Sequence, residues 1–409
     1  EDCIAVDEVS LSFDSLLYDN DDTTTLPPAR TWYKDNVDAS DKHREPEDSI
    51  ANWTIKLGKS TYKVHKGILG QGVHKSGYFN HIFLRWTQGT NDITDLTLSL
   101  HTQCHHAWEA VLDFVYMDSI IVAASPDDWT KHLFKTASTV VSTFKIAHFL
   151  LMPSLMRICV NHMKNNLTHE TAYPMLRKAL VLSPGLDAII HNCISNLALE
   201  FNQCDAKSFV GLPLETISTI LSRANTDEFK AKPLKISNAI AACLRDLDSD
   251  NASQEQYFHG LTGSLSRVAA EDAIFLFAKS IEYKHDGVRQ LSLLTVTGCF
   301  CQKKIWENIA LIQDHQAVCE LLGRDELNAP EDCVFQAIKL YCETKGDALS
   351  SEERTEIWKT CRFVHLNNKE TILDLINVND LPPLFVKLAL VGSLIHGKFD
   401  QEKFDALAG

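Results

Sequence analysis

The chain has 409 residues, which at roughly 150 residues per domain predicts about two to four domains. Hydrophobic residues make up 45% and charged residues 23%, a balance that excludes a disordered or fibrous chain. The formal net charge of -15 disfavours nucleic-acid binding, because such a chain repels phosphate backbones.

The 12 cysteines lack the paired spacings of a disulfide framework, and several lie beside leucines in helical patterns. We therefore expect buried, reduced thiols and an intracellular protein of the cytoplasm or nucleus. The longest apolar runs, at residues 120–124 and 149–152, are far shorter than the roughly 20 residues that a membrane crossing needs. We expect no contact with a membrane.

Residues 1–50 form the first predicted segment, an irregular acidic extension with 14 acidic and 4 basic residues and one short strand at 9–13. From Trp53 onward apolar and polar residues alternate on both sides of Gly58, which predicts a hairpin with its turn at this glycine. The next predicted elements are helices at 66–70 and 76–85, a third strand at 96–100 and a helix at 105–116.

Beyond residue 127 the apolar spacing is almost entirely helical, with helices ending near Leu151, Lys164, Leu182 and Phe201. Together these elements predict an α+β chain, in which a mixed sheet capped by helices precedes a mainly helical region. An internal repeat at an offset of 101 residues indicates two related helical modules. It pairs Ala172 with Ala273, Ile217 with Val318, Leu221 with Leu322 and Arg223 with Arg324.

The residues around the first and second predicted helices resemble the signature of the BTB (POZ) fold. The matching positions are His65, Lys66, Leu69, Ser76, Tyr78, Phe79 and Phe83. Their neighbours also resemble the family, because a strand pair precedes them, a helix ending in Phe114-Val115-Tyr116 follows, and residues 141–152 are similar to the next family helix. The resemblance implies a BTB domain at 51–166.

The later helices resemble the BACK domain of Kelch-type adaptors. The run from Phe209 to Pro213, followed by Leu221-Ser222, is similar to its Phe-x-x-Leu-Pro and Leu-Leu-Ser pair, and 321–338 is similar to its closing run. No Kelch repeats are visible. The implied order is an acidic extension, a BTB domain and two helical modules, at 1–50, 51–166, 167–250, a linker at 251–266, and 267–409.

The BTB resemblance implies a surface for self-association, with an acid–base pair near it. Asn52 stands at the family's acid position and Lys66 at its base position, so we expect Lys66 to reach solvent or to find another acid. Candidate residues of a homodimer interface are Asn52, Trp53, Ile55 and Lys66.

The resemblance also implies a cullin-3 contact, which in the family follows an apolar-x-Glu pattern. The local equivalent is Trp86-Thr87-Gln88, where glutamine replaces glutamate. The Trp86 side chain either docks on cullin-3 or packs into the core of its own domain. The full candidate cullin-binding set is Phe83, Leu84, Arg85, Trp86, Thr87, Gln88 and Tyr116.

Signals for enzyme chemistry are weak. The stretch 70–76 lacks the glycine that a phosphate loop needs directly before its lysine. The group of His101, Cys104, His105 and His106 and the pair Cys299 and Cys301 have no clear second ligand pair for zinc. We therefore expect no cofactor, no metal and no catalysis. The sequence predicts an interaction scaffold that joins an unidentified client protein to a cullin-3-type ubiquitin ligase, or alternatively an oligomerisation or regulatory adaptor without a ligase.

Overall fold

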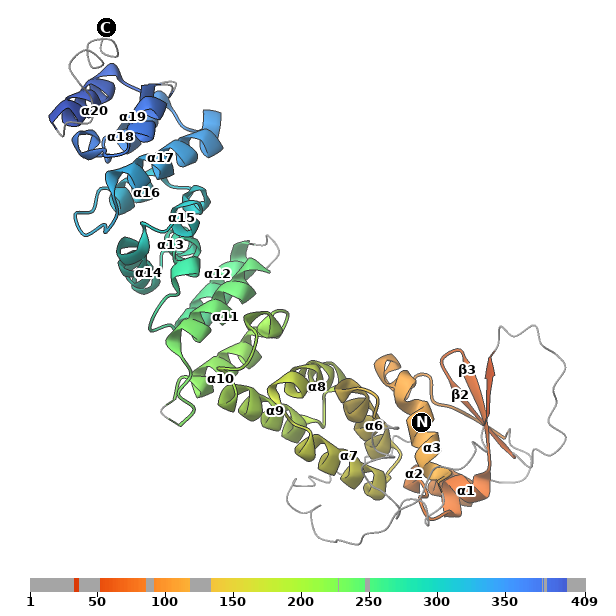
Figure 1. Ribbon diagram of the computed structural model, residues 1–409. Helices are drawn as coiled ribbons and strands as arrows, with labels where there is room; N and C mark the ends of the chain where they lie inside the picture. Colours follow the sequence, from red (N-terminus) through yellow and green to blue (C-terminus); the bar gives the residue numbers. More distant parts are fainter. Residues whose placement is uncertain are drawn as a thin grey trace. The chain divides into compact units, whose positions relative to one another are not determined.

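The computed structural model describes residues 33–36, 52–85, 92–117, 134–226, 228–246, 251–376, 378 and 381–395, the first of these ranges for its backbone alone. The chain divides into two compact units, Glu1–Cys204 and Asp205–Gly409 (Figure 1). The predicted strand at 9–13 lies outside the described residues. Within the described part, the first unit combines a sheet with helices and the second unit contains only helices, which confirms the α+β fold class.

The sheet of the first unit has the strand order β1-β3-β2-β4 among the described residues. Its strands are β1 (Tyr33–Asn36), β2 (Trp53–Leu57), β3 (Ser60–Val64) and β4 (Ile93–Asp95). Strands β2 and β3 pair antiparallel, with Trp53 opposite Val64. Gly58 makes the turn with φ +62°, a backbone conformation that glycine adopts without strain. The predicted hairpin is confirmed, and β1 adds part of the acidic extension to its edge.

The third strand does not lie where the sequence predicts it. It is β4, which pairs in parallel with β2, whereas residues 96–100 form a turn closed by the Leu100 N–H and the Leu96 carbonyl, 3.0 Å apart. Leu96 and Leu100 are buried, but the side chain of Leu98 is 99% exposed. The alternation of leucines at 96–100 therefore predicted the third strand a few residues after its actual position, Ile93–Asp95.

The helices of the first unit agree with the predicted positions. They are α1 (Lys66–Gln71), α2 (Gly77–Arg85), α3 (Trp108–Val115), α6 (Ala137–Phe149), α7 (Pro153–Asn165), α8 (His169–Leu182) and α9 (Asp187–Leu199). The helix predicted at 105–116 begins as a 3-10 turn at Thr102–Ala107. Pro153 is the first residue of α7, where the missing N–H of proline leaves no helical hydrogen bond unmade.

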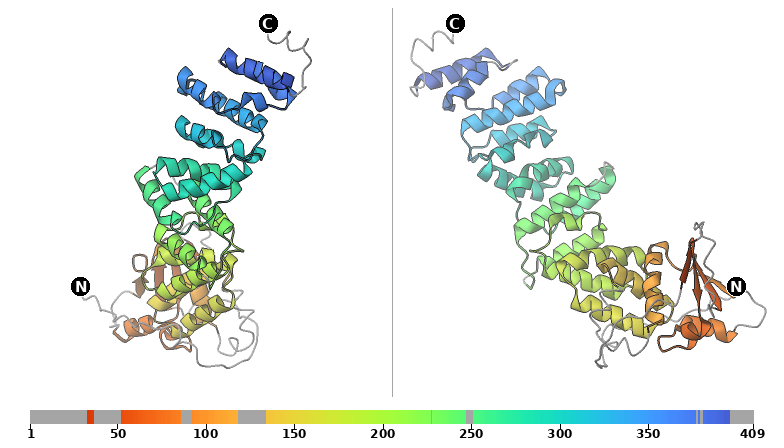
Figure 2. Two further views of the ribbon diagram at one scale, coloured as in Figure 1. Left: turned by 90° about the vertical axis from the view of Figure 1, so that its left-hand side faces the viewer. Right: turned by 45° about the vertical axis from the view of Figure 1, so that its right-hand side comes forward.

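The second unit is a series of helices, each of which contacts helices close to it in the sequence (Figure 2). They are α10 (Leu214–Ala224), α11 (Pro233–Arg245), α12 (Asn251–Thr262), α13 (Ala273–Glu282), α14 (Asp286–Cys299), α15 (Lys303–Trp306), α16 (His315–Leu322), α17 (Glu331–Lys345), α18 (Ser351–Trp358), α19 (Lys369–Ile376) and α20 (Pro383–Ile395). Such local contact patterns are typical of helical-repeat architectures.

The segment 251–266, where the sequence favours a linker, contains helix α12. Phe258 and Leu261 of α12 are fully buried, and the buried Gln254 accepts a hydrogen bond of 2.7 Å from the Tyr283 hydroxyl. A helix replaces the predicted linker here, because the residues before Phe258 are polar and their pattern does not indicate this apolar contact. The division between the two units falls at 204/205, inside the predicted module 167–250.

The apolar positions that the internal repeat aligns are buried in both copies, whereas Arg223 and Arg324 are half-buried. Ile217 of α10 and Val318 of α16 are both fully buried. Leu221 of α10 is also fully buried, and Leu322 of α16 is 3% exposed. The repeat therefore pairs core positions of corresponding helices.

Candidate protein-interaction site

Helix α2 is held in place at its first turn by the buried Ser76. The Ser76 hydroxyl accepts a hydrogen bond from the Phe79 N–H at 3.2 Å and donates one of 2.8 Å to the Leu150 carbonyl at the end of α6. The same Ser76 hydroxyl therefore caps the start of α2 and links this helix to the end of α6. Phe79 is fully buried as a result, and the orientation of the helix decides which later residues face outward.

The last turn of α2 separates the candidate cullin-binding residues into two groups. The Phe83 ring faces inward, 5.1 Å from the Trp53 ring in an edge-on contact. Leu84, by contrast, is 72% exposed, and Arg85 is exposed beside it. Trp86, Thr87 and Gln88 lie outside the described residues. The end of α2 thus presents an apolar and a cationic side chain to solvent.

Gly70 provides the space that Phe83 occupies. A Cβ atom at Gly70 would lie 2.6 Å from the Cδ2 atom of Phe83, closer than van der Waals packing allows. The absence of a side chain on this turn of α1 therefore determines how closely α1 and α2 pack.

The acid partner of Lys66 is Asp92, a residue outside the predicted candidate site. The Lys66 Nζ lies 2.9 Å from an Asp92 carboxylate oxygen and 4.5 Å from the centre of the Trp53 ring. Asn52 acts instead on the backbone, because its Oδ1 accepts the Lys66 N–H at 2.8 Å. Of the two outcomes expected for Lys66, exposure to solvent or contact with another acid, the structure shows the second. No sequence pattern indicated Asp92, because the strand that it precedes, β4, lies ahead of the strand predicted at 96–100.

Two other candidate residues of the dimer surface are core residues in the single chain. Trp53 is 3% exposed and Ile55 is fully buried. Only Asn52 and part of Lys66 lie at the surface in this group. Trp53 and Ile55 therefore support that surface from below.

Tyr116, at the end of α3, fixes the start of α1. Its hydroxyl oxygen accepts the His65 N–H at 2.7 Å and lies 3.1 Å from the His65 Nδ1. The family-like His65 and Tyr116 are thus a structural pair, and the partly buried Tyr116 ring has limited surface to offer a partner.

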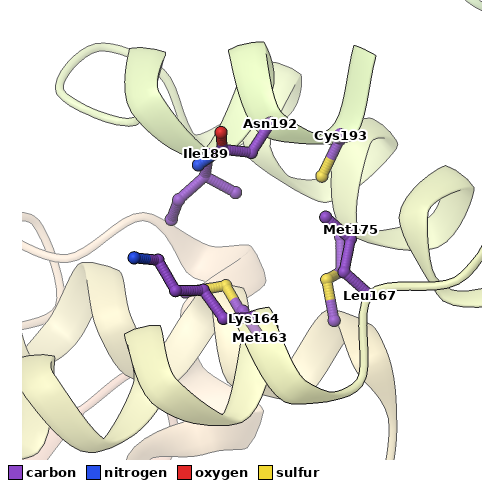
Figure 3. Close-up of a pocket in the computed structure, with 7 residues that line it drawn as sticks. All are labelled: Met163, Lys164, Leu167, Met175, Ile189, Asn192 and Cys193. Carbon is purple, nitrogen blue, oxygen red and sulfur yellow. The ribbon is translucent and has the colours of Figure 1, made fainter. Parts of the chain in front are cut away.

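A cavity of about 180 Å³ opens among α7, α8 and α9 (Figure 3). It is lined by Met163, Lys164, Leu167, Met175, Ile189, Asn192 and Cys193. Burial raises the pKa of the Cys193 thiol to about 12, so this group is neutral and the lining is mainly apolar. Lys164 and Asn192 supply the polar groups. The cavity suits one apolar side chain of a partner, and no sequence motif indicated it.

The groups weighed for metal binding do not assemble into a site. In the part of the chain that the structure describes, no three His, Cys, Asp or Glu side chains are placed to hold a metal ion. Cys104 is buried, whereas His101 and His106 are exposed. Within the same residues, none of the helices combines the length and the apolar character that a membrane span requires.

Comparison with known proteins gives a family match within the first unit. The family model of the BTB/POZ domain matches residues 41–167. No curated protein and no solved structure matches the chain. The match includes the hairpin, α1, α2, β4, α3, α6 and α7.

Proposed function

The chain carries a BTB/POZ domain, and from that premise we propose that it is a substrate adaptor of a cullin-3-type ubiquitin ligase. A BTB domain supports a role in protein–protein interaction, and the remaining, largely helical chain is consistent with a BACK-like region. The protein acts by bringing two proteins together and not by catalysis.

The observation that carries this proposal is the exposed end of α2. Leu84 and Arg85 project from the helix that leads into Trp86-Thr87-Gln88, while Phe83 anchors the same turn to the core. A rigid helix end followed by an aromatic residue suits an interface whose binding energy is concentrated in a few apolar side chains. The cavity lined by Met175 and Ile189 supplies a second apolar contact on the same unit.

Gln88 stands where the family contact has a glutamate, so the ionic part of that contact is missing. Charged contacts at an interface affect mainly the association rate and specificity, whereas buried apolar side chains dominate affinity. Cullin-3 binding should therefore be weaker than with glutamate, and Gln88→Glu should strengthen it.

The client is proposed to bind the second unit. A hollow of about 340 Å³ lies between α14 and the loop after α16, with Leu294 74% exposed at its edge and Arg324 among its lining residues. We place the complex inside the cell, because each of the 11 described cysteines is a free thiol.

The test is direct binding of the purified full chain to the cullin-3 N-terminal domain, measured by biolayer interferometry. We expect micromolar or tighter binding, with a loss of about tenfold for Leu84→Ala, since exposed apolar anchors cost about 1–2 kcal/mol when truncated. The matched control is Leu98→Ala, because Leu98 is even more exposed on the same unit. No binding by the wild type, or equal losses for the two variants, would overturn the proposal.

The alternative is an oligomerisation or regulatory adaptor that does not bind a ligase. The glutamine at position 88 favours it, because this substitution removes the charged cullin contact. Light scattering after size-exclusion chromatography distinguishes it: a stable homodimer without cullin-3 binding supports the alternative, and a monomer that binds cullin-3 rejects it.

A further inference from the structure

Two lysines of the first unit converge on the region where the 3-10 turn Thr102–Ala107 meets α6 and α8. Lys145 of α6 donates a hydrogen bond of 2.6 Å to the Pro184 carbonyl. Lys178 of α8 donates one of 2.8 Å to the Gln103 carbonyl. Both ammonium groups are thus held by neutral acceptors, and each has donors left for a further partner.

The counter-charge for these lysines is missing from the described part of the chain. No carboxylate among the described residues forms an ion pair with Lys145 or Lys178. The Cys104 thiol interacts electrostatically with both lysines, and burial raises its pKa to about 11, so the thiol stays neutral. Burial also lowers the pKa of both lysines from its ordinary value.

Two histidines extend this group. His148 lies one turn after Lys145 on α6, and His106 lies beside Lys178. Both side chains are exposed. Partial desolvation of each imidazole ring nevertheless lowers its pKa, and the neighbouring lysine lowers it further. The groups that face this surface from η2 (Thr102–Ala107), α6 and α8 are therefore cationic or neutral, in a chain with 54 acidic and 39 basic residues.

We propose that Lys145, Lys178, His106 and His148 form a binding site for a carboxylate-rich peptide segment of a partner protein. Partly desolvated cations that have no counter-charge among the described residues gain more from an anion than fully hydrated surface lysines do. The two ammonium groups come from different helices and are held by different carbonyls, so they match several carboxylates along a peptide better than a single small anion. The inference does not rest on the cullin-3 proposal, because it concerns a different surface and a different ligand.

The probe is a fluorescein-labelled hexaglutamate peptide, titrated with the full chain at roughly 50 mM salt, where screening is weak. Fluorescence anisotropy measures the affinity. We expect Lys145→Gln/Lys178→Gln to weaken binding at least about fivefold, as loss of two partly exposed ion pairs implies. The control Lys59→Gln/Lys75→Gln removes the same charge from exposed positions of the same unit and should change affinity less than about twofold.

Further variants show whether weaker binding comes from the loss of the lysine charges or from a disturbed fold. Lys145→Arg/Lys178→Arg should retain most of the affinity, and circular dichroism of the glutamine variant shows whether the fold is intact. Equal losses for the two glutamine variants, equal binding of a hexaglutamine peptide, or no binding by the wild type would each overturn the proposal. Displacement of hexaglutamate by inorganic phosphate at matched ionic strength would also overturn it, since the site would then select a phosphoryl group.

Discussion

Lys66 and Asp92 form an ion pair across the first unit, with the Lys66 Nζ 2.9 Å from the carboxylate and above the Trp53 ring. The Lys66 side chain is only 19% exposed, whereas Asp92 is 55% exposed. A mostly buried ammonium without an acid is costly, so Asp92 stabilises the position of Lys66 more than an ordinary surface carboxylate would.

We predict that Asp92→Asn lowers the free energy of unfolding by about 1 kcal/mol, because it leaves the Lys66 charge with weaker compensation. Urea unfolding followed by tryptophan fluorescence measures the change. The double variant Asp92→Asn/Lys66→Met should recover most of the loss, since it removes the charge that needed a partner. If the two variants are equally destabilised, the ion pair is not the cause.

Local patterns in the sequence were sufficient for much of the fold. Trp53, Ile55 and Leu57 alternate with polar residues, and all three are buried in β2 as this pattern predicts. The same pattern failed at Leu98, because alternation does not say whether a face is covered. A turn can carry the same spacing of leucines when only its two ends reach the core.

The candidate site depends on contacts between distant residues, about which local sequence patterns carry little information. Asp92 reaches Lys66 because β4 pairs in parallel with β2, a pairing that no local pattern specifies. The cavity beside Cys193 depends on how three helices pack and has no motif. The outward orientation of Leu84, in turn, follows from the way Ser76 fixes α2 to α6.

Two glycines of α1 provide a matched pair of substitutions. Gly70→Ala should lower the free energy of unfolding by about 1–3 kcal/mol, because the new Cβ meets the Phe83 ring at 2.6 Å. Gly67→Ala should raise it by up to about 1 kcal/mol, because nothing lies within 4 Å of its Cβ and alanine favours a helix. Urea unfolding compares the two. Equal effects of both substitutions would show that Phe83 does not occupy the space beside Gly70.

The stability of the first unit should depend on pH through His74. Its ring packs 4.4 Å from the Phe114 ring, and its Nε2 is buried with no hydrogen-bond partner among the described residues. Burial lowers the pKa of His74 below its usual value of 6.5. The unfolded chain therefore binds a proton more readily than the folded one, so the stability is full above pH 6.5 and declines as the pH falls through the folded-state pKa.

His74→Phe keeps the aromatic contact and removes this titration. The difference in unfolding free energy between His74→Phe and the wild type should therefore grow as the pH falls from about 7.5 to about 5.5, a range that covers the usual histidine pKa. Urea unfolding at a series of pH values measures it. A difference that stays constant over this range would contradict a buried, neutral His74.

The cavity among α7, α8 and α9 predicts that two buried cysteines of the first unit respond differently to enlargement. Cys193 lines the cavity, so Cys193→Leu can place its added atoms there and should change the free energy of unfolding by less than about 1 kcal/mol. Cys159 is fully buried in α7 and does not line the cavity, so Cys159→Leu should cost about 1–3 kcal/mol through overpacking. Differential scanning calorimetry of both variants measures the contrast. If the proposed second contact with cullin-3 uses this cavity, Cys193→Leu should also weaken cullin-3 binding without loss of fold. A large loss of stability for Cys193→Leu, similar to that for Cys159→Leu, would show that the cavity is too small to accept a side chain from a partner.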